Sequence, residues 1–308
     1  MHLATIGDIA VDIRAAAGEA LTRGADARGD IRLLPGGSAA NVAVWAARLG
    51  ARATCLGAVG ADPWGAWLRD DLRREGVRAI GPRRGRTAAI LTFLDADGER
   101  TFVTDRAAAL SLRFADLPGR VWDGLDALHI PAYSLFAGPL AETATMAAHQ
   151  ARERAVLLSV DLSSVSLLKA FGPERFAALL ASLRPDLLFA NLEEARALFP
   201  GETADDVAAA MRAITRVAIV KRGAAGIIVT SEAGRVTASA PAHAIDSTGA
   251  GDALAAAFLV HYARDDDIMR AAWAAVRLAG AVVQGEGARP PVRLRLNRFV
   301  RMRGIHEG

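Results

Sequence analysis

Strand-like and helix-like segments alternate along most of this 308-residue chain. Short apolar runs are typical of buried strands, and each is followed by a segment that is typical of a helix. Repeated units of this kind predict a mostly parallel sheet covered by helices. We expect strands at 52–59, 125–130, 155–160, 186–190 and 216–221, and helices at 39–49, 63–75, 139–152, 174–183, 192–198, 204–213, 250–263 and 267–284.

Two segments interrupt this alternation. Residues 13–36 are rich in Gly, Ala and charge, and residues 87–104 predict a hairpin because an Asp97-Gly98 pair favours a tight turn. Antiparallel strands inserted between parallel units usually leave the main sheet. We expect a small β lid, formed from about 13–36 and 87–105, that closes over a substrate and excludes water. No internal repeat or linker divides the chain, so we expect one domain over residues 1–308.

The segment Asp246–Asp252, Asp-Ser-Thr-Gly-Ala-Gly-Asp, precedes a helix-forming run. Small residues at Gly249, Ala250 and Gly251 let the backbone turn and expose its N–H groups, and a helix that begins there adds its unpaired amides, so the site suits an anion. If the anion is a phosphate, Asp252 is placed to act as a base. The alternative is simple helix capping by residues 246–248. Capping does not require Gly-Ala-Gly, which favours the phosphate interpretation.

A second glycine-rich segment, Pro35–Ala43, also leads into a helix. Its paired glycines permit close backbone approach, and Asn41 offers a donor and an acceptor on the first turns of that helix. This combination suits the recognition of hydroxyl groups; the alternative is a tight turn with Asn41 facing solvent. No G-x-G-x-x-G follows a strand, and Gly57–Gly60 lacks that spacing, so a dinucleotide-binding fold is not indicated.

Composition limits the partners. The 37 basic residues nearly balance the 34 acidic ones, for a net charge of +3, which argues against nucleic acid as the main partner. Apolar runs fall short of the roughly 18 residues that a membrane span needs. The single cysteine, Cys55, lies in an apolar run and suits a reducing compartment. We expect a cytoplasmic protein that binds neither membrane nor nucleic acid. Arginines crowd the C-terminus as a solvated face or an oligomer contact: Arg293, Arg295, Arg298, Arg301 and Arg303.

Six blocks occur in a fixed order and together resemble the ribokinase-like carbohydrate kinase family, often called the PfkB family. They are Gly7–Asp12, Gly36–Asn41, Gly57–Gly65, Asp246–Asp252 and, more weakly, Asn191–Glu194 and Lys221–Gly226. The resemblance extends from residue 7 to about 291. It implies a three-layer α/β/α ribokinase-like fold and ATP-dependent phosphorylation of a hydroxyl of a small sugar or related polyol, with Mg²⁺. Lids in this family often pack against each other, so a homodimer is expected.

The resemblance also implies roles for individual residues at the reacting end. Asp252 would take the proton from the sugar hydroxyl, and the backbone amides of Gly249, Ala250, Gly251 and Asp252 would hold the transferring phosphoryl group. Three further matches would hold the sugar hydroxyls: Asp12, Gly37 and Asn41. Asp12 is expected just beyond a strand, with a surface aspartate at a strand end as the alternative.

At the nucleotide end, Asn191 and Glu194 match an element that organises the Mg²⁺–phosphate end, with Glu194 acting through water. Lys221, Gly223 and Gly226 match a loop on the nucleotide side. For Asn191 and Glu194, the alternative is ordinary polarity on an exposed helix face. For Lys221, the alternative is a solvated lysine. Adenine would then lie between residues 223–240 and the helix that ends near Val283.

Two departures from the family pattern bear on the substrate and the cation, and one further residue is a candidate substrate contact. Ser163 and Ser166 stand where many sugar-acid and fructose kinases of the family carry Asn and Arg, which weakens those assignments. Asp246 would belong to a monovalent-cation loop with Thr248 and residues 285–291, but Pro291 replaces a hydroxyl residue, which leaves activation by K⁺ open. Arg106, directly after the predicted lid hairpin, either contacts a carboxylate or phosphate of the substrate or pairs with Asp105.

Two rival functions remain. A nucleoside kinase of the same family needs a slot for a base, which Phe102, Tyr133 and Phe136 are candidates to build. A catalytically silent relative would bind a sugar or nucleotide as a sensor. Retention of Asp252 with its glycines argues against the sensor, because a binding protein needs no base.

Overall fold

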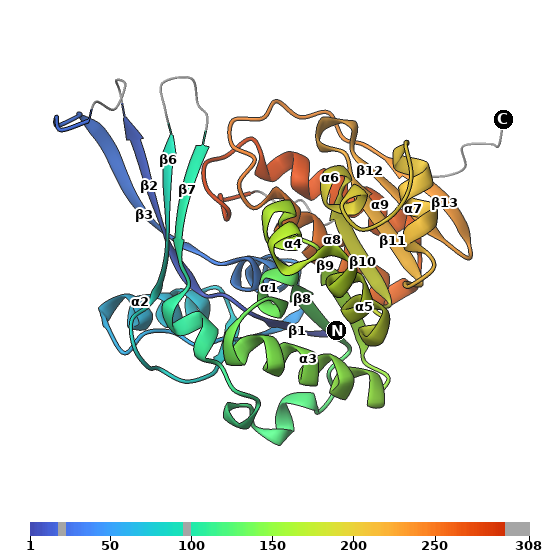
Figure 1. The fold of residues 1–308 in the computed structure, drawn as a ribbon, viewed down its shortest axis with the longest axis horizontal. Coiled ribbons are helices and arrows are strands. Elements are labelled where there is room, and N and C mark those ends of the chain that lie inside the picture. The colour runs from blue at the N-terminus through green and yellow to red at the C-terminus, as the bar shows by residue number, and fades with distance from the viewer. Residues whose placement is uncertain (18–22, 95–99, 293–308) are drawn as a thin grey trace.

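The computed structural model describes residues 1–17, 23–94 and 100–292 (Figure 1). Its main sheet has nine strands in the order β13-β12-β11-β10-β9-β8-β1-β4-β5, parallel from β11 to β5 with two antiparallel strands at one edge. The strands are β1 (His2–Ile6), β4 (Arg52–Leu56), β5 (Val77–Ile80), β8 (Ala127–Pro131), β9 (Leu157–Asp161), β10 (Leu187–Asn191), β11 (Val217–Lys221), β12 (Ile227–Ser231) and β13 (Gly234–Ala238).

Helices cover both faces of this sheet. Alternate strand residues enter two separate cores: Leu187 and Phe189 of β10 face one, and Leu188 and Ala190 face the other. The first core is completed by α1 (Ser38–Arg48), α2 (Pro63–Arg74), α8 (Ala250–Asp265) and α9 (Ile268–Val282). The second is completed by α3 (Gly138–Glu153), α4 (Val165–Phe171), α5 (Pro173–Leu183), α6 (Leu192–Arg196) and α7 (Ala204–Met211). The predicted three-layer α/β/α architecture is therefore confirmed.

A separate sheet of four strands projects beside the main body (Figure 1). Its order is β3 (Gly29–Gly36), β2 (Ala10–Ala17), β6 (Ala88–Leu94) and β7 (Arg100–Asp105), and only the β2–β6 pair is parallel. The prediction of a small β lid is confirmed, although its first strand begins earlier than expected, at Ala10. Pro35 is accommodated because β3 is an edge strand. The predicted turn at 95–98 lies outside the described residues.

The two faces of the small sheet differ in chemistry. Cross-strand pairing places Leu33, Ile13, Leu91 and Val103 in one row, and paired residues share a face. Their neighbours along β2, residues 12 and 14, point to the opposite face because side chains alternate in a strand. The small sheet therefore has one apolar face and one face that carries an aspartate and an arginine.

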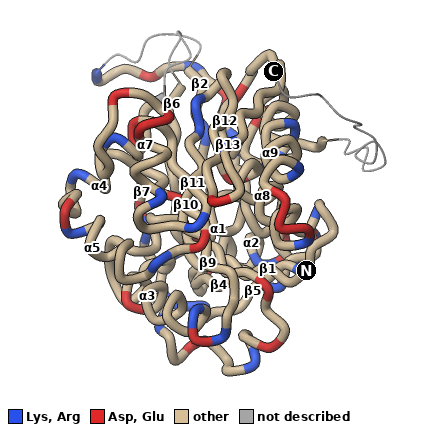
Figure 2. The backbone as a smooth tube through the Cα atoms, turned by 90° about the vertical axis from the view of Figure 1, so that its right-hand side faces the viewer, with Lys and Arg blue, Asp and Glu red and all other residues tan. Residues whose placement is uncertain are grey.

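Figure 2 shows basic and acidic residues interspersed along the described backbone. The C-terminal arginine cluster at 293–303 lies outside the described residues. Within the part of the chain that the structure describes, no helix is long and apolar enough to cross a membrane.

Candidate active site

Two glycines allow the starts of α1 and α8 to approach their neighbours closely. Gly37 has φ 95°, and a Cβ there would lie 2.2 Å from the carbonyl oxygen of Asp8. Gly249, the residue before α8, has φ 74°, and a Cβ there would lie 2.6 Å from the Cα of Ala288. Both positions combine a left-handed backbone with a close contact, so they require glycine. The predicted sharp turns are confirmed at both places.

The carboxylate of Asp252 joins these two helix starts. It accepts hydrogen bonds from Ser38 Oγ at 2.7 Å and from Asn41 Nδ2 at 2.8 Å. Burial raises the pKa of Asp252 to about 6, although both hydrogen bonds favour its charged form. Asn41 is only 6% exposed, so the alternative in which it faces solvent is wrong. The predicted base and a predicted hydroxyl-binding residue are therefore in direct contact.

Arg289 fixes the orientation of Asn41. Its Nε donates to Asn41 Oδ1 at 2.7 Å, which turns the amide NH₂ group toward Asp252. Nη1 of the same arginine lies 2.8 Å from Asp71 Oδ2. Neither Ser38 nor Arg289 was among the predicted residues. Ser38 had a detectable signal, since it stands three residues before Asn41 and so shares its helix face.

The residue at the N-cap of α8 makes no side-chain capping bond. This residue is Gly249, whereas α6 and α9 are capped by the side chains of Asn191 and Asp267. The carboxylate of Asp246 is directed elsewhere, to the backbone N–H groups of Thr248 at 2.9 Å and Gly287 at 2.7 Å. The carboxylate of Asp246, one of the three residues suggested as caps, is therefore bound before the helix begins. An uncapped helix start of this kind is suited to an anion.

Asp12 lies near the turn that precedes α1. It is the third residue of β2 and 8% exposed, so the expectation that it lies just beyond a strand, or at an exposed strand end, is wrong. Thr92 Oγ1 donates to its Oδ1 at 3.1 Å. A Cβ on Gly36 would lie 3.2 Å from the Cβ of Asp12. Asp12 is therefore brought beside the turn that leads to Asn41.

Arg106 is held by a different aspartate from the one expected. Its Nε and Nη2 bind the two carboxylate oxygens of Asp8 at 2.9 and 2.6 Å, and Nη1 donates to the carbonyl of Tyr133 at 2.8 Å. Asp105 pairs with Arg86 instead, so the suggested Arg106–Asp105 pair is wrong. Contact between Arg106 and a substrate stays a prediction.

Lys221 lies beside the start of α8. Its Nζ is 2.8 and 2.7 Å from the two carboxylate oxygens of Asp161, and a Cβ on Gly251 would lie 3.7 Å from that nitrogen. Burial lowers the pKa of Lys221, but the charges of Asp161 and Glu194 raise it more, so the ammonium group stays protonated. The alternative of a solvated lysine is wrong.

Asn191 and Glu194 form a reciprocal capping box at the start of α6. Asn191 Oδ1 accepts from the Glu194 N–H, and Glu194 Oε2 accepts from the Asn191 N–H, both at 2.8 Å. Glu194 is 4% exposed, and burial raises its pKa, so exposed helix polarity does not describe it. The box leaves Oε1 of the carboxylate outside its two hydrogen bonds. This arrangement fits a contact to Mg²⁺ through water.

A cavity of about 810 Å³ extends from Asn191 and Lys221 to the α9 end at Val283. Its wall includes the predicted glycines Gly223, Gly226 and Gly251, and residues 239–242, which overlap the end of the segment 223–240 that is expected to contact adenine. Its size is within the usual range for a cofactor or small-molecule site. Four of the residues predicted for the nucleotide end, Asn191, Lys221, Gly223 and Gly226, therefore line one cavity, and Glu194 is not among its lining residues.

The aromatic residues suggested for a nucleoside base are dispersed. Phe136 packs against Phe171 and Phe176, with ring centroids 5.5 and 5.1 Å apart, in the second core. Phe102 is 58% exposed on β7, and the Tyr133 hydroxyl donates to the Ser163 carbonyl at 3.1 Å. Phe136 is therefore part of the core rather than of a base slot.

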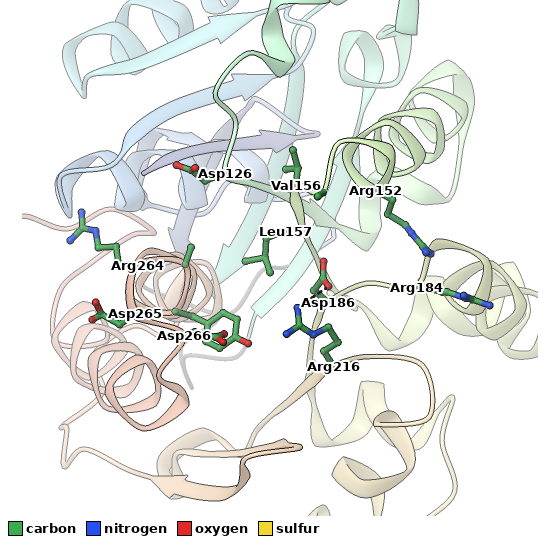
Figure 3. Close-up of a pocket in the computed structure, with 13 residues that line it drawn as sticks. Asp126, Arg152, Val156, Leu157, Arg184, Asp186, Arg216, Arg264, Asp265 and Asp266 are labelled. Carbon is green, nitrogen blue, oxygen red and sulfur yellow. Dashed lines mark ion pairs between the residues drawn. The ribbon is translucent and has the colours of Figure 1, made fainter.

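A second cavity, of about 740 Å³, lies at the opposite ends of the main-sheet strands (Figure 3). Leu157 begins β9, and Asp186 and Arg216 directly precede β10 and β11, so this cavity is at the amino ends of the strands. Asp161, Asn191 and Lys221 are the last residues of the same three strands. The candidate site thus lies at the carboxyl ends, where open α/β sheets usually bind ligands.

Comparisons with known proteins agree with this geometry. A model of the pfkB family carbohydrate kinases matches residues 1–294. The fructokinase of Salmonella typhimurium is 32% identical over 258 residues, which cover 77% of this chain and 80% of that protein. The structure of adenosine kinase from Sinorhizobium meliloti superposes with a TM-score of 0.82 at 28% identity, over 94% of this chain and 96% of that one. A putative ribokinase II from E. coli, in complex with ATP and Mg²⁺, gives 0.81 at 24% identity, over 93% and 94%.

The family match spans the sequence from the first strand to the loop after α9. The fold agrees with it. The chain belongs to the pfkB family of carbohydrate kinases, phosphotransferases with an alcohol group as acceptor.

Proposed function

We propose that this kinase transfers the γ-phosphoryl group of ATP to a hydroxyl of a small neutral sugar or related polyol. The observation that carries the proposal is the buried Asp252 carboxylate, held by Ser38 and Asn41 at the uncapped start of α8. This position sets a base beside a backbone suited to an anion. A protein that only binds a sugar has no use for that combination.

The reaction follows from these groups. Asp252 accepts the proton of the acceptor hydroxyl while the oxygen forms its bond to phosphorus and the bond to the leaving phosphate oxygen breaks. The N–H groups of Gly249, Gly251 and Asp252 stabilise charge on the transferring phosphoryl oxygens, whereas the Ala250 N–H donates to the Ser247 carbonyl at 3.3 Å. Lys221, next to Gly251, neutralises charge on the phosphate chain. Asp12 and Asn41 orient the acceptor through its other hydroxyl groups, and Gly37 lets the backbone approach it.

The cavity between residues 223–242 and α9 would hold the nucleoside part of ATP, with Gly223 and Gly226 at its wall. Mg²⁺, when bound, supplies positive charge to the phosphate oxygens. Glu194 would hold it through water, and Asn191 fixes the direction of that carboxylate. The ATP and Mg²⁺ bound to the E. coli relative support this part of the proposal.

The charges at the acceptor end favour a neutral substrate. Asp12 and Asp252 both face this region, whereas Arg106 is paired with Asp8 and Arg289 with Asp71. An anionic acceptor would therefore meet two carboxylates, and the nearby guanidinium groups are already engaged. Arg106, in this arrangement, positions Asp8 and the Tyr133 backbone.

The small sheet supports a homodimer. Leu33 and Val103 end the apolar row on its outer face and are 50% and 58% exposed, and Ile31 on the same face is 69% exposed. Exposed apolar side chains gathered on one face mark an interaction surface. A second copy of the same sheet offers the matching face.

The substitution Asp252→Asn tests the base. We expect kcat to fall by about 10²- to 10⁴-fold, the usual contribution of general-base catalysis, with ATP affinity near that of wild type. A coupled ADP-release assay and calorimetry with an ATP analogue measure the two quantities. Asp265→Asn at the far end of the same helix, where the side chain pairs with Arg270, is the matched control. Turnover of Asp252→Asn near that of wild type would contradict the assignment.

The raised pKa of Asp252, about 6, predicts the pH dependence. Because the base acts only when ionised, kcat/KM should be flat above pH 7 and fall about tenfold per unit below pH 6. Ser38 donates to the ionised form, so Ser38→Ala should move this acid limb upward by roughly one pH unit. The measurement is kcat/KM against pH for wild type and for Ser38→Ala, with saturating ATP. Acid limbs at the same pH in both proteins would exclude Asp252 as the titrating group.

A panel of acceptors tests the substrate class. Neutral pentoses, hexoses and polyols should give kcat/KM values roughly tenfold or more above those of sugar acids and sugar phosphates, because like charges that face each other cost several kcal/mol. Nucleosides belong in the same panel, and a preferred nucleoside would favour that rival. An anionic acceptor that is preferred by wild type and lost in Arg106→Ala would show that Arg106 is a substrate contact.

The dimer is tested by Val103→Asp. Wild type should sediment as a dimer at micromolar concentration and the variant as a monomer, since a charge on the apolar face opposes its burial. Met269→Asp on α9 is the matched control, because Met269 is also 58% exposed but far from the small sheet in the sequence. A wild-type protein that is monomeric at every concentration would refute the dimer.

A further inference from the structure

Protein groups fill the surroundings of Asp246, the residue for which the family resemblance implies a monovalent cation. Arg14 Nη1 lies 2.7 Å from Asp246 Oδ2, which also accepts from the Gly287 N–H at 2.7 Å. The Thr248 N–H donates to Oδ1 at 2.9 Å. The side chains of Arg14 and Asp246 are 12% and 4% exposed. The carboxylate is therefore already balanced by a guanidinium group that is largely shielded from water.

Three carbonyl groups of the loop 285–291, for which the resemblance also implies a role at the cation, are directed toward α1. Trp45 Nε1 donates to the Ala288 carbonyl at 3.0 Å, and Arg48 Nη1 donates to the carbonyls of Arg289 and Pro290 at 3.3 and 3.1 Å. Arg48 is itself fixed by Glu75 at 2.6 Å. A cation gives up its water only where several oxygen atoms replace it. Three of the loop oxygen atoms are already hydrogen-bonded to α1, and the Asp246 carboxylate is paired with Arg14, so the residues present do not fit a monovalent cation.

We propose that Arg14 takes the place of that cation, and that this kinase works without K⁺. The guanidinium group supplies the positive charge at Asp246 and thereby holds the segment 246–251 that leads into α8. A metal cation at the same carboxylate would stand next to a like charge and be repelled. Burial raises the pKa of Asp246, but its hydrogen bonds and Arg14 lower it to about 2, in agreement with a permanently ionised partner.

Arg14, which carries this positive charge, belongs to the small sheet that forms the lid. Arg14 stands two residues after Asp12 in β2, so both side chains point to the same face of the small sheet. The strand that offers a carboxylate to the acceptor therefore also brings the positive charge to the anion-binding turn. In this chain, the conformation of the turn at residues 246–251 thus depends on the position of β2 rather than on an ion from solution.

The closing experiment compares wild type in KCl and in tetramethylammonium chloride at equal ionic strength. Two readouts are taken: the thermal melting midpoint with and without a magnesium–ATP analogue, and turnover with the best acceptor. We expect both to be unchanged between the two salts. A higher melting midpoint or faster turnover in KCl would overturn the proposal. Only the turnover arm rests on the proposed function, so if no acceptor is phosphorylated, the melting arm still decides.

A variant series tests Arg14 itself. Arg14→Met should lose about tenfold or more of the turnover, since it leaves the buried Asp246 without its partner, and Arg14→Lys should retain more. Arg32→Met is the matched control: Arg32 is paired with Arg14 across β2 and β3, but it contacts Asp30 and Glu286 at the surface. Arg14→Met with wild-type turnover in tetramethylammonium chloride would overturn the proposal. If Arg14→Met does not fold, the comparison of salts on wild type remains decisive.

Discussion

The contact between Asp252 and the first turn of α1 is the interaction on which the rest of the site depends. It joins two helix starts that are far apart in the sequence, and Ser38, Asn41 and Arg289 all serve it. Each donor favours the ionised carboxylate, while burial opposes ionisation. The balance sets the pKa of the base near the range in which it can both hold and release a proton.

The parallel sheet explains why the other groups converge there. Asp161, Asn191 and Lys221 are the last residues of three adjacent parallel strands. They therefore lie at the same end of the sheet, although they are far apart in the sequence. Short-range capping then refines their positions, as in the Asn191–Glu194 box. At the amino ends of the same strands, acidic and basic residues line a separate cavity (Figure 3). Chain direction in the sheet thus places the candidate site and the second cavity at opposite ends of the same strands.

Much of this could be predicted from the sequence. Hydrophobic periodicity located most helices and strands within a few residues, and glycine-rich turns identified the starts of α1 and α8, because both signals are local. The partners of the site were missed for the opposite reason. Arg14 and Asp246 are paired across 232 positions and Arg289 and Asn41 across 248, and local pattern does not encode such pairs. Arg106 was noticed correctly as a cation near the lid, but its partner, Asp8, also depends on tertiary structure.

The Lys221–Asp161 pair has a consequence for the protein before any nucleotide arrives. A buried ammonium group without a counter-charge would destabilise the folded chain. Asp161 supplies that counter-charge, so the lysine can stay charged and in place while the cavity is empty. In the proposed reaction, an arriving phosphate would exchange one anionic neighbour of the lysine for another, and the ammonium group would not need to be recharged or drawn in from solvent. The empty protein thus already maintains the electrostatic environment that its ligand will meet.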